Sequence, residues 1–161
     1  MYILKMGETM FYIPFWLYLI ITVILAGFTI SVRKLRFIDI QIIIMVIAVS
    51  MSCDMLLCKQ FGLYNYVSEE YRGWYSFWAN FVACPAFGLI FAKFIPSRRE
   101  RAVLYIIMWV AFFTLFEAFI LIPYGILYNH GWHTIPDSLI GYILALTLEY
   151  TYFRLLVKRE R

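Results

Sequence analysis

The chain has 161 residues, of which 64% are hydrophobic and 15% are charged, and its formal net charge is +4 at pH 7. Ordinary globular domains are about 45–50% apolar and about 25% charged, and a soluble chain this short could not bury so many apolar side chains. The composition therefore predicts a lipid environment, and it argues against a dedicated nucleic-acid-binding protein and against a disulfide-stapled secreted domain.

Five stretches of the sequence are long and apolar enough to cross a bilayer as helices. A hydrocarbon core of about 30 Å needs about 20 apolar residues in a helix. The stretches are residues 10–32, 37–58, 74–95, 102–128 and 136–157. Only short polar segments separate them, so we expect a single transmembrane domain over residues 1–161, with an all-α bundle of five helices.

Lysine and arginine are distributed unevenly over the segments that connect these spans. All but three of the 14 lie near the first connection, the third connection or the C-terminal tail, the exceptions being Lys5, Lys59 and Arg72. Basic residues gather on the cytoplasmic side of membrane proteins. We therefore expect a multi-pass protein of the cell membrane, with its N-terminus outside and its C-terminus cytoplasmic. Its basic loops are expected to contact anionic lipid headgroups rather than nucleic acid.

The third span carries small residues at a spacing of four. These residues are Ser76, Asn80, Cys84, Gly88 and Ala92. Small side chains let helices approach closely in lipid, so the row predicts close packing, either against the chain's own helices or in a homodimer. Pro85 predicts a kink in this span, and Pro123 predicts a bend in the outer third of the fourth.

Three candidate carboxylates lie inside the predicted spans, namely Asp54, Glu117 and Glu149. A charge at the bilayer centre costs about 2.5–3.5 kcal/mol on insertion scales, so such residues usually face the bundle interior and often carry function. If the loop around Trp132 makes a symmetric hairpin, Glu117 and Glu149 should lie about 3 Å apart along the membrane normal. No basic residue falls at that depth, so we expect neutralisation by protonation. Hydrogen-bond partners could come from Asn80, Thr114, Tyr142 and Tyr152.

The last loop contains polar residues that are weak candidates for a metal site. His130 and His133 have a spacing compatible with zinc, and Asp137 follows four residues after His133. A zinc site needs three or four ligands, and this loop offers no cysteine, so solvated histidines are the simpler interpretation. No nucleophile, phosphate-binding or cofactor motif is present, and no cofactor is expected.

Several short segments in the middle and end of the chain follow one another in a recognisable order. They are Asp54, Tyr64-Asn65-Tyr66, Ala83-Cys84-Pro85-Ala86-Phe87, Phe94-Ile95-Pro96, Trp109, Phe116-Glu117, Tyr128-Asn129-His130-Gly131-Trp132 and Ser138. Over residues 39–140 this order resembles an uncharacterised family of small multi-pass membrane proteins from Gram-positive, spore-forming bacteria. The resemblance implies a bacterial plasma-membrane protein and no particular activity. It gives Pro85, Glu117, Trp132 and Ser138 more weight than Glu149.

Five aromatic-rich spans are also similar to the tryptophan-rich sensory protein (translocator protein) family. That family carries a Trp-x-Pro-Pro signature in its first loop, whereas this loop reads Arg33-Lys34-Leu35-Arg36. We therefore set that family aside, although a ligand-binding bundle of similar size stays open.

For function, we predict a non-enzymatic membrane protein that either acts as an accessory or partner subunit or binds a lipophilic ligand. The alternative is a small proton- or cation-linked transporter or channel component, and an intramembrane enzyme is the third class. Partners would be the bilayer and either another membrane protein or further copies of the chain. Candidate ligand- or proton-binding residues are Glu117, Glu149, Asp54, Asn80, Trp132 and Ser138. A water-filled pocket reaching both glutamates would favour transport, and a dry, packed interior would favour the first class.

Overall fold

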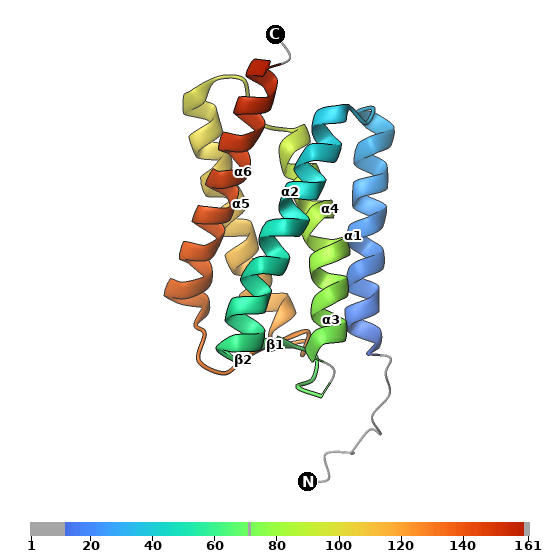
Figure 1. Cartoon of the computed structure of the whole chain (residues 1–161), viewed down its shortest axis with the longest axis vertical. Helices are drawn as coiled ribbons and strands as arrows, with labels where there is room; N and C mark the ends of the chain where they lie inside the picture. The colour runs from blue at the N-terminus through green and yellow to red at the C-terminus, as the bar shows by residue number, and fades with distance from the viewer. Residues whose placement is uncertain (1–11, 71, 160–161) are drawn as a thin grey trace.

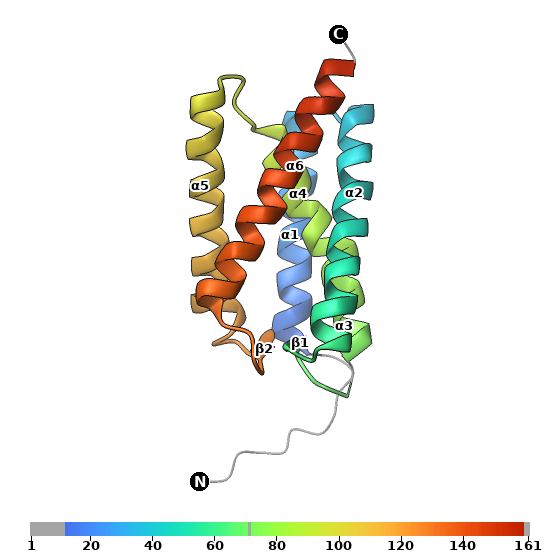
Figure 2. The same ribbon diagram turned by 60° about the vertical axis from the view of Figure 1, so that its left-hand side comes forward.

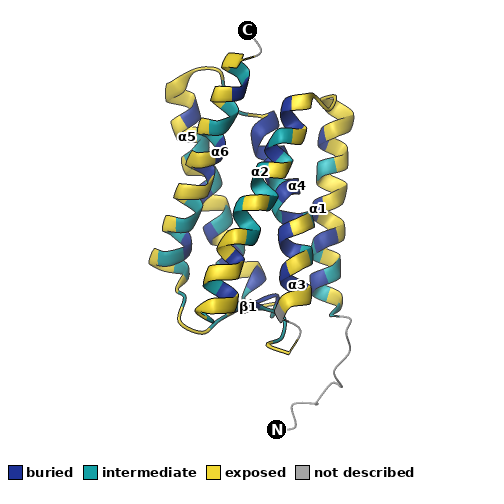
Figure 3. Ribbon diagram, viewed as in Figure 1, coloured by how far each residue is buried: buried dark blue, intermediate teal, exposed yellow. Residues whose placement is uncertain are grey.

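The computed structural model describes residues 12–70 and 72–159. In these residues five helices are long and apolar enough to cross a membrane, as the sequence predicts (Figure 1). They are Ile13–Val32, Phe37–Gln60, Gly73–Lys93, Arg99–Leu121 and Thr134–Arg159. Figure 3 shows that the outward faces of the bundle are largely exposed. Many of the side chains on those faces are large and apolar, which is compatible with a lipid surround.

Four of the five spans combine α-helix with a further turn, which is π-helical in the second, third and fourth spans, whereas in the fifth the backbone of Ile135 is extended. The second span is α2 (Phe37–Asp54) with the turn Met55–Gln60, and the third is α3 (Arg72–Trp78), the turn Ala79–Ala83 and α4 (Cys84–Lys93). The fourth is α5 (Arg99–Phe116) with the turn Glu117–Leu121, and the fifth is the turn Thr134–Ser138 with α6 (Leu139–Arg159). The first span, α1 (Ile13–Val32), is regular throughout. The π-turns therefore all lie towards one end of the bundle or in the middle of the third span.

A short antiparallel ribbon joins two connections at that end. Strand β1 (Tyr64–Tyr66) pairs with β2 (Leu127–Asn129), with Tyr64 opposite Asn129. Just beyond β2, the backbone N–H groups of residues 130–132 all donate to the Leu63 carbonyl, at 2.8, 3.1 and 3.2 Å. The ribbon thus fixes the second connection against the fourth. We call this the ribbon end of the bundle, and we call the opposite end the basic end (Figure 1).

The third span is the centre of the bundle. Of its apolar stretch 61% is buried, against at most 28% in the other four spans. The segment α4 packs against α1, α2 and α6, while α5 packs mainly against α6 (Figure 2). The predicted row of small residues faces these neighbours. Ser76 and Ala92 are 1% and 2% exposed, and a Cβ atom added to Gly88 would lie 2.8 Å from Val46 Cγ2.

Two proline expectations have different outcomes. Directly before Pro85, where the sequence predicts a kink, the helix adopts the π-turn Ala79–Ala83. Proline lacks the N–H that would continue regular helical bonding, and a wider turn is one way to absorb that loss. Pro123 does not bend the fourth span, because that helix ends at Leu121 instead of reaching residue 128.

Close packing at Gly88 gives a testable prediction. Gly88→Ala places a methyl group against Val46 and should cost about 1–3 kcal/mol through overpacking. Gly27→Ala is the matched control, because Gly27 lies in α1 with nothing within 4 Å of an added Cβ. We expect Gly88→Ala to lower the thermal unfolding temperature in detergent, and Gly27→Ala to leave it unchanged or raise it. Equal unfolding temperatures for the two variants would contradict the observed packing.

Candidate functional site

The carboxyl group of Glu117 lies in a cage of hydroxyl groups near the ribbon end. Glu117 is 1% exposed and begins the π-turn at the end of α5. Its Oε1 accepts hydrogen bonds from Ser138 Oγ at 2.7 Å and Thr134 Oγ1 at 3.0 Å, and its Oε2 is 2.6 Å from the Tyr142 hydroxyl. Thr134 and Ser138 lie in the turn that begins the fifth span. This turn and the π-turn of α5 therefore bring the fourth and fifth spans together around one carboxyl group.

The indole group of Trp132 sets the direction of these hydrogen bonds. Trp132 Nε1 donates to Ser138 Oγ at 2.7 Å, and an indole nitrogen can only donate. Ser138 must therefore direct its own hydrogen towards Glu117 Oε1. The Tyr142 hydroxyl donates to the other carboxyl oxygen, Oε2, so both oxygens of Glu117 accept hydrogen bonds from the fifth span.

A second buried carboxyl group, that of Asp54, lies in the same half of the bundle. Asp54 is 4% exposed and accepts a hydrogen bond from the Tyr64 hydroxyl at 3.3 Å. The side chains of Ser76 and Asn80 also face this carboxyl group. Asn80 Nδ2 in turn donates to the Ser76 carbonyl at 2.9 Å. Burial and, next, the charge of Asp54 raise the pKa of Tyr64 well above its usual value, so this hydroxyl keeps its proton and stays a donor.

The two carboxyl groups belong to one polar cluster. The rings of Tyr64 and Trp132 meet edge to face, with centroids 6.1 Å apart. A continuous series of contacts thus runs from Asp54 through Tyr64, Trp132 and Ser138 to Glu117. We call this the ribbon-end cluster, and it comprises Asp54, Tyr64, Asn80, Glu117, Trp132, Thr134, Ser138 and Tyr142. It brings together five of the six candidate residues predicted from sequence.

Glu149 lies apart from this cluster, which corrects the prediction that it lies at nearly the same depth as Glu117. Glu117 is level with Ser138 and Tyr142, and Glu149 follows Tyr142 by seven residues, or about 10 Å along α6. The hairpin is asymmetric because the fourth helix ends at Leu121 and the chain then forms a turn and β2. Glu149 is 5% exposed, its Oε1 has no hydrogen-bond partner, and an added Cβ on Gly88 would lie 3.4 Å from both carboxyl oxygens.

The three predicted metal candidates do not form one site. His130 Nε2 contacts Asn65 Oδ1 and lies 3.4 Å from Glu69 Oε1. His133 Nδ1 instead lies 3.4 Å from Asp137 Oδ2. Among residues 12–70 and 72–159, no group of three His, Cys, Asp or Glu side chains is placed to hold a metal ion.

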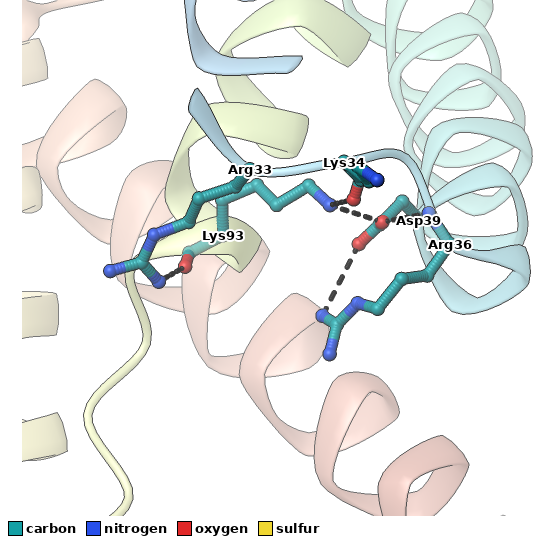
Figure 4. Close-up of polar contacts among 5 residues, drawn as sticks. All are labelled: Arg33, Lys34, Arg36, Asp39 and Lys93. Carbon is teal, nitrogen blue, oxygen red and sulfur yellow. Dashed lines mark hydrogen bonds and ion pairs between the residues drawn. The ribbon is translucent and has the colours of Figure 1, made fainter. Parts of the chain in front are cut away.

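A buried ion pair at the basic end is missing from the sequence-based candidates. Lys93 Nζ contacts Asp39 Oδ2 and donates to the Lys34 carbonyl at 2.7 Å, and both charged side chains are at most 2% exposed (Figure 4). The Arg36 backbone N–H donates to the same carboxyl group at 2.6 Å. Arg33 donates to the Lys93 carbonyl, and its guanidinium carbon lies 4.4 Å from the centroid of the Phe94 ring.

Asp39 and Lys93 could have been paired from sequence. Asp39 lies in the first turn of its helix, close to Arg36, where an acidic residue is typical. Lys93 was used only as one of the basic residues that predict the orientation in the membrane. The informative signal is that opposite charges fall inside two predicted spans at the same end of the bundle. An ion pair is the expected way to bury both charges.

An apolar groove opens on the side of the bundle between α1 and α5. Its volume is about 390 Å³. Leu17, Ile21 and Leu25 of α1 line one wall, Phe112 and Phe116 of α5 line the other, and the ring of Phe87 from α4 also lines it. No groove could be predicted from sequence, because its walls carry the same residue types as any lipid-facing surface.

Comparisons with family models, curated proteins and solved structures found no match. The resemblance to small membrane proteins of spore-forming bacteria therefore stays a prediction.

The hydroxyl cage predicts how Glu117 variants behave. Glu117→Leu leaves the hydroxyls of Thr134, Ser138 and Tyr142 without their acceptor, at about 1–3 kcal/mol for each group left unsatisfied. Glu117→Gln should be much milder, because its amide oxygen can accept from Ser138 and Thr134 while its amide group donates to Tyr142. Thermal unfolding in detergent measures both variants. A Leu variant as stable as the Gln variant would show that the cage does not stabilise the fold.

The ion pair gives a second prediction. Asp39→Asn leaves the Lys93 ammonium buried without a counter-charge, which should cost about 3–5 kcal/mol. Combining it with Lys93→Met removes both charges and should recover part of that loss. Glu100→Gln is the control, because Glu100 is an exposed carboxylate at the same end of the bundle. A double variant less stable than Asp39→Asn alone would contradict the pairing.

Proposed function

We propose that this protein is an integral membrane protein that binds a lipophilic ligand in the groove between α1 and α5. The observation that carries this proposal is the groove itself, whose volume of about 390 Å³ falls within the range of about 300–1,000 Å³ typical of small-molecule sites. Its walls are almost entirely apolar side chains. A ligand held there would gain its affinity from hydrocarbon contact.

The carboxyl groups support this function better than they support transport. Asp54 accepts a hydrogen bond from Tyr64 of the ribbon, and Glu117 accepts hydrogen bonds from Ser138 and Tyr142 of the fifth span. Glu149 lies about 10 Å further along α6, against Gly88. A carrier of protons or cations needs carboxylates that exchange with one another or with water, whereas all three carboxyl groups are buried and Glu149 lies apart from the cluster that holds Asp54 and Glu117.

We also propose that the ribbon end faces outward and the basic end faces the cytoplasm of a bacterial cell membrane. The basic end gathers the arginines and lysines of two connections and of the last turns of α6, which supports this orientation (Figure 1).

The orientation can be tested by thiol labelling of intact cells. A cysteine replacing Ser68, beside the ribbon, should react with an impermeant reagent from outside, whereas one replacing Ser97, at the basic end, should not. The parent protein sets the background, because its three cysteines all lie within the spans. The reverse labelling pattern would overturn the orientation.

The groove can be tested with a photoactivatable hydrocarbon probe in detergent or nanodiscs. The probe should label peptides from α1 and α5, and Ile21→Trp, which fills the groove, should reduce that labelling several-fold. Ile20→Trp is the matched control, because Ile20 and Ile21 are similarly exposed, at 55% and 48%, but only Ile21 lines the groove. Equal labelling of the two variants would contradict a binding site in the groove.

A further inference from the structure

We infer that the ligand of this groove is an uncharged lipid, with one hydrocarbon chain lying along α1 and its polar group at the ribbon end among tyrosine hydroxyls. The inference rests on the proposed function and names the chemical class of the ligand. It follows from the length of the groove, from the orientation of its few polar atoms and from the chemistry of its mouth.

The groove has the length of one leaflet. Along α1 it extends from Pro14, at the start of the helix, to Leu25. At 1.5 Å per residue this is about 16 Å, or about half of a 30 Å hydrocarbon core. The groove therefore runs from the ribbon end to about the middle of the membrane, which suits a single chain entering from one leaflet.

The interior of the groove offers few hydrogen-bond partners to a polar group of a ligand. Its one threonine, Thr22, donates its hydroxyl hydrogen to the Leu19 carbonyl at 2.8 Å, within its own helix. A second hydroxyl comes from Tyr18, and the remaining side chains from α1 and α5 that line the groove are aliphatic groups and phenyl rings. An unsatisfied polar group in such a place costs several kcal/mol in a hydrocarbon surround. The part of the ligand inside the groove is therefore hydrocarbon.

The mouth of the groove is polar but neutral. There Tyr124 lines the groove, and its carbonyl accepts a hydrogen bond from the Tyr12 hydroxyl at 2.6 Å. Gly125 follows with a φ of +62°, and an added Cβ would lie 2.8 Å from the Tyr128 hydroxyl and 3.1 Å from that of Tyr12. The absence of a side chain at Gly125 thus lets two phenol groups converge beside the groove.

The charge at this mouth points to the class of headgroup. Burial and, next, the neighbouring Tyr128 raise the pKa of Tyr12, so this phenol stays neutral at physiological pH. No Lys, Arg, Asp or Glu is among the described residues that line the groove. Phosphate groups are recognised by arginine and lysine, and most of these lie at the basic end. Neutral phenols instead suit a hydroxyl, ester or carbonyl group, as in an acylglycerol or a long-chain alcohol.

Two matched lipid probes test the inference. A diacylglycerol and a phosphatidylglycerol, each with the same photoactivatable acyl chain, are presented to the full chain in nanodiscs, and the labelled peptides are quantified. We expect the diacylglycerol probe to label α1 and α5 several-fold more strongly, and Ile21→Trp to abolish most of that labelling. Tyr128→Phe should reduce the preference by about fivefold, the value of one hydrogen bond. Tyr152→Phe is the control, since Tyr152 packs at the basic end and does not line the groove.

The outcomes separate the two proposals. Two results would overturn the uncharged headgroup and leave the groove as the binding site. In one the two probes label equally, in the other phosphatidylglycerol labels more strongly, and in both Ile21→Trp still abolishes the labelling. Labelling that Ile21→Trp leaves unchanged would overturn both the groove and the inference built on it. An unchanged preference in Tyr128→Phe would overturn the assignment of the polar group to the tyrosine mouth.

Discussion

A buried polar group in an apolar helix bundle is costly unless it finds a partner within the protein, and the partners found here determine how the two ends of the bundle are held together. At the basic end the Asp39 carboxylate neutralises Lys93 and binds the start of α2 to the end of α4. At the ribbon end the Glu117 carboxyl group accepts hydrogen bonds from hydroxyl groups of the fifth span. Between these ends close contact along small residues such as Gly88 replaces the hydrophobic force that lipid cannot supply.

The π-helical turns follow from the same requirement. The turn Met55–Gln60 directly follows Asp54, the turn Ala79–Ala83 contains Asn80, and the turn Glu117–Leu121 begins with its glutamate. A π-turn widens the helix and rotates the residues beyond it, and such turns are frequently found at functional sites. The half of the bundle near the ribbon therefore departs from regular helix where buried polar side chains have to meet. The half near the basic end keeps regular helices and places its charges at helix ends.

Much of this could be predicted from sequence, and what could not has a physical reason. Five apolar helices were predictable, because length and hydropathy alone determine whether a helix can span lipid. Glu117, Trp132 and Ser138 could be singled out as polar residues next to or within apolar spans, and the structure joins them. The predicted relative depth of Glu117 and Glu149 was wrong, because the prediction depended on where the fourth helix ends. That end at Leu121 is set by pairing of β2 with a strand more than sixty residues earlier, which local patterns do not encode.

The groove arises because the outer helices pack against different neighbours. The helix α1 packs on α4, whereas α5 packs on α6, so α1 and α5 stand on either side of the third span without closing over it. Aromatic rings connect the two helices across this space, since the rings of Tyr18 in α1 and Phe116 in α5 have centroids 6.0 Å apart. Phe87 of α4 contacts Phe116 with centroids 6.2 Å apart, and Phe112 stacks on Phe116 at 5.6 Å. These rings also line the groove, so the aromatic packing that holds α5 against the third span forms the groove wall as well.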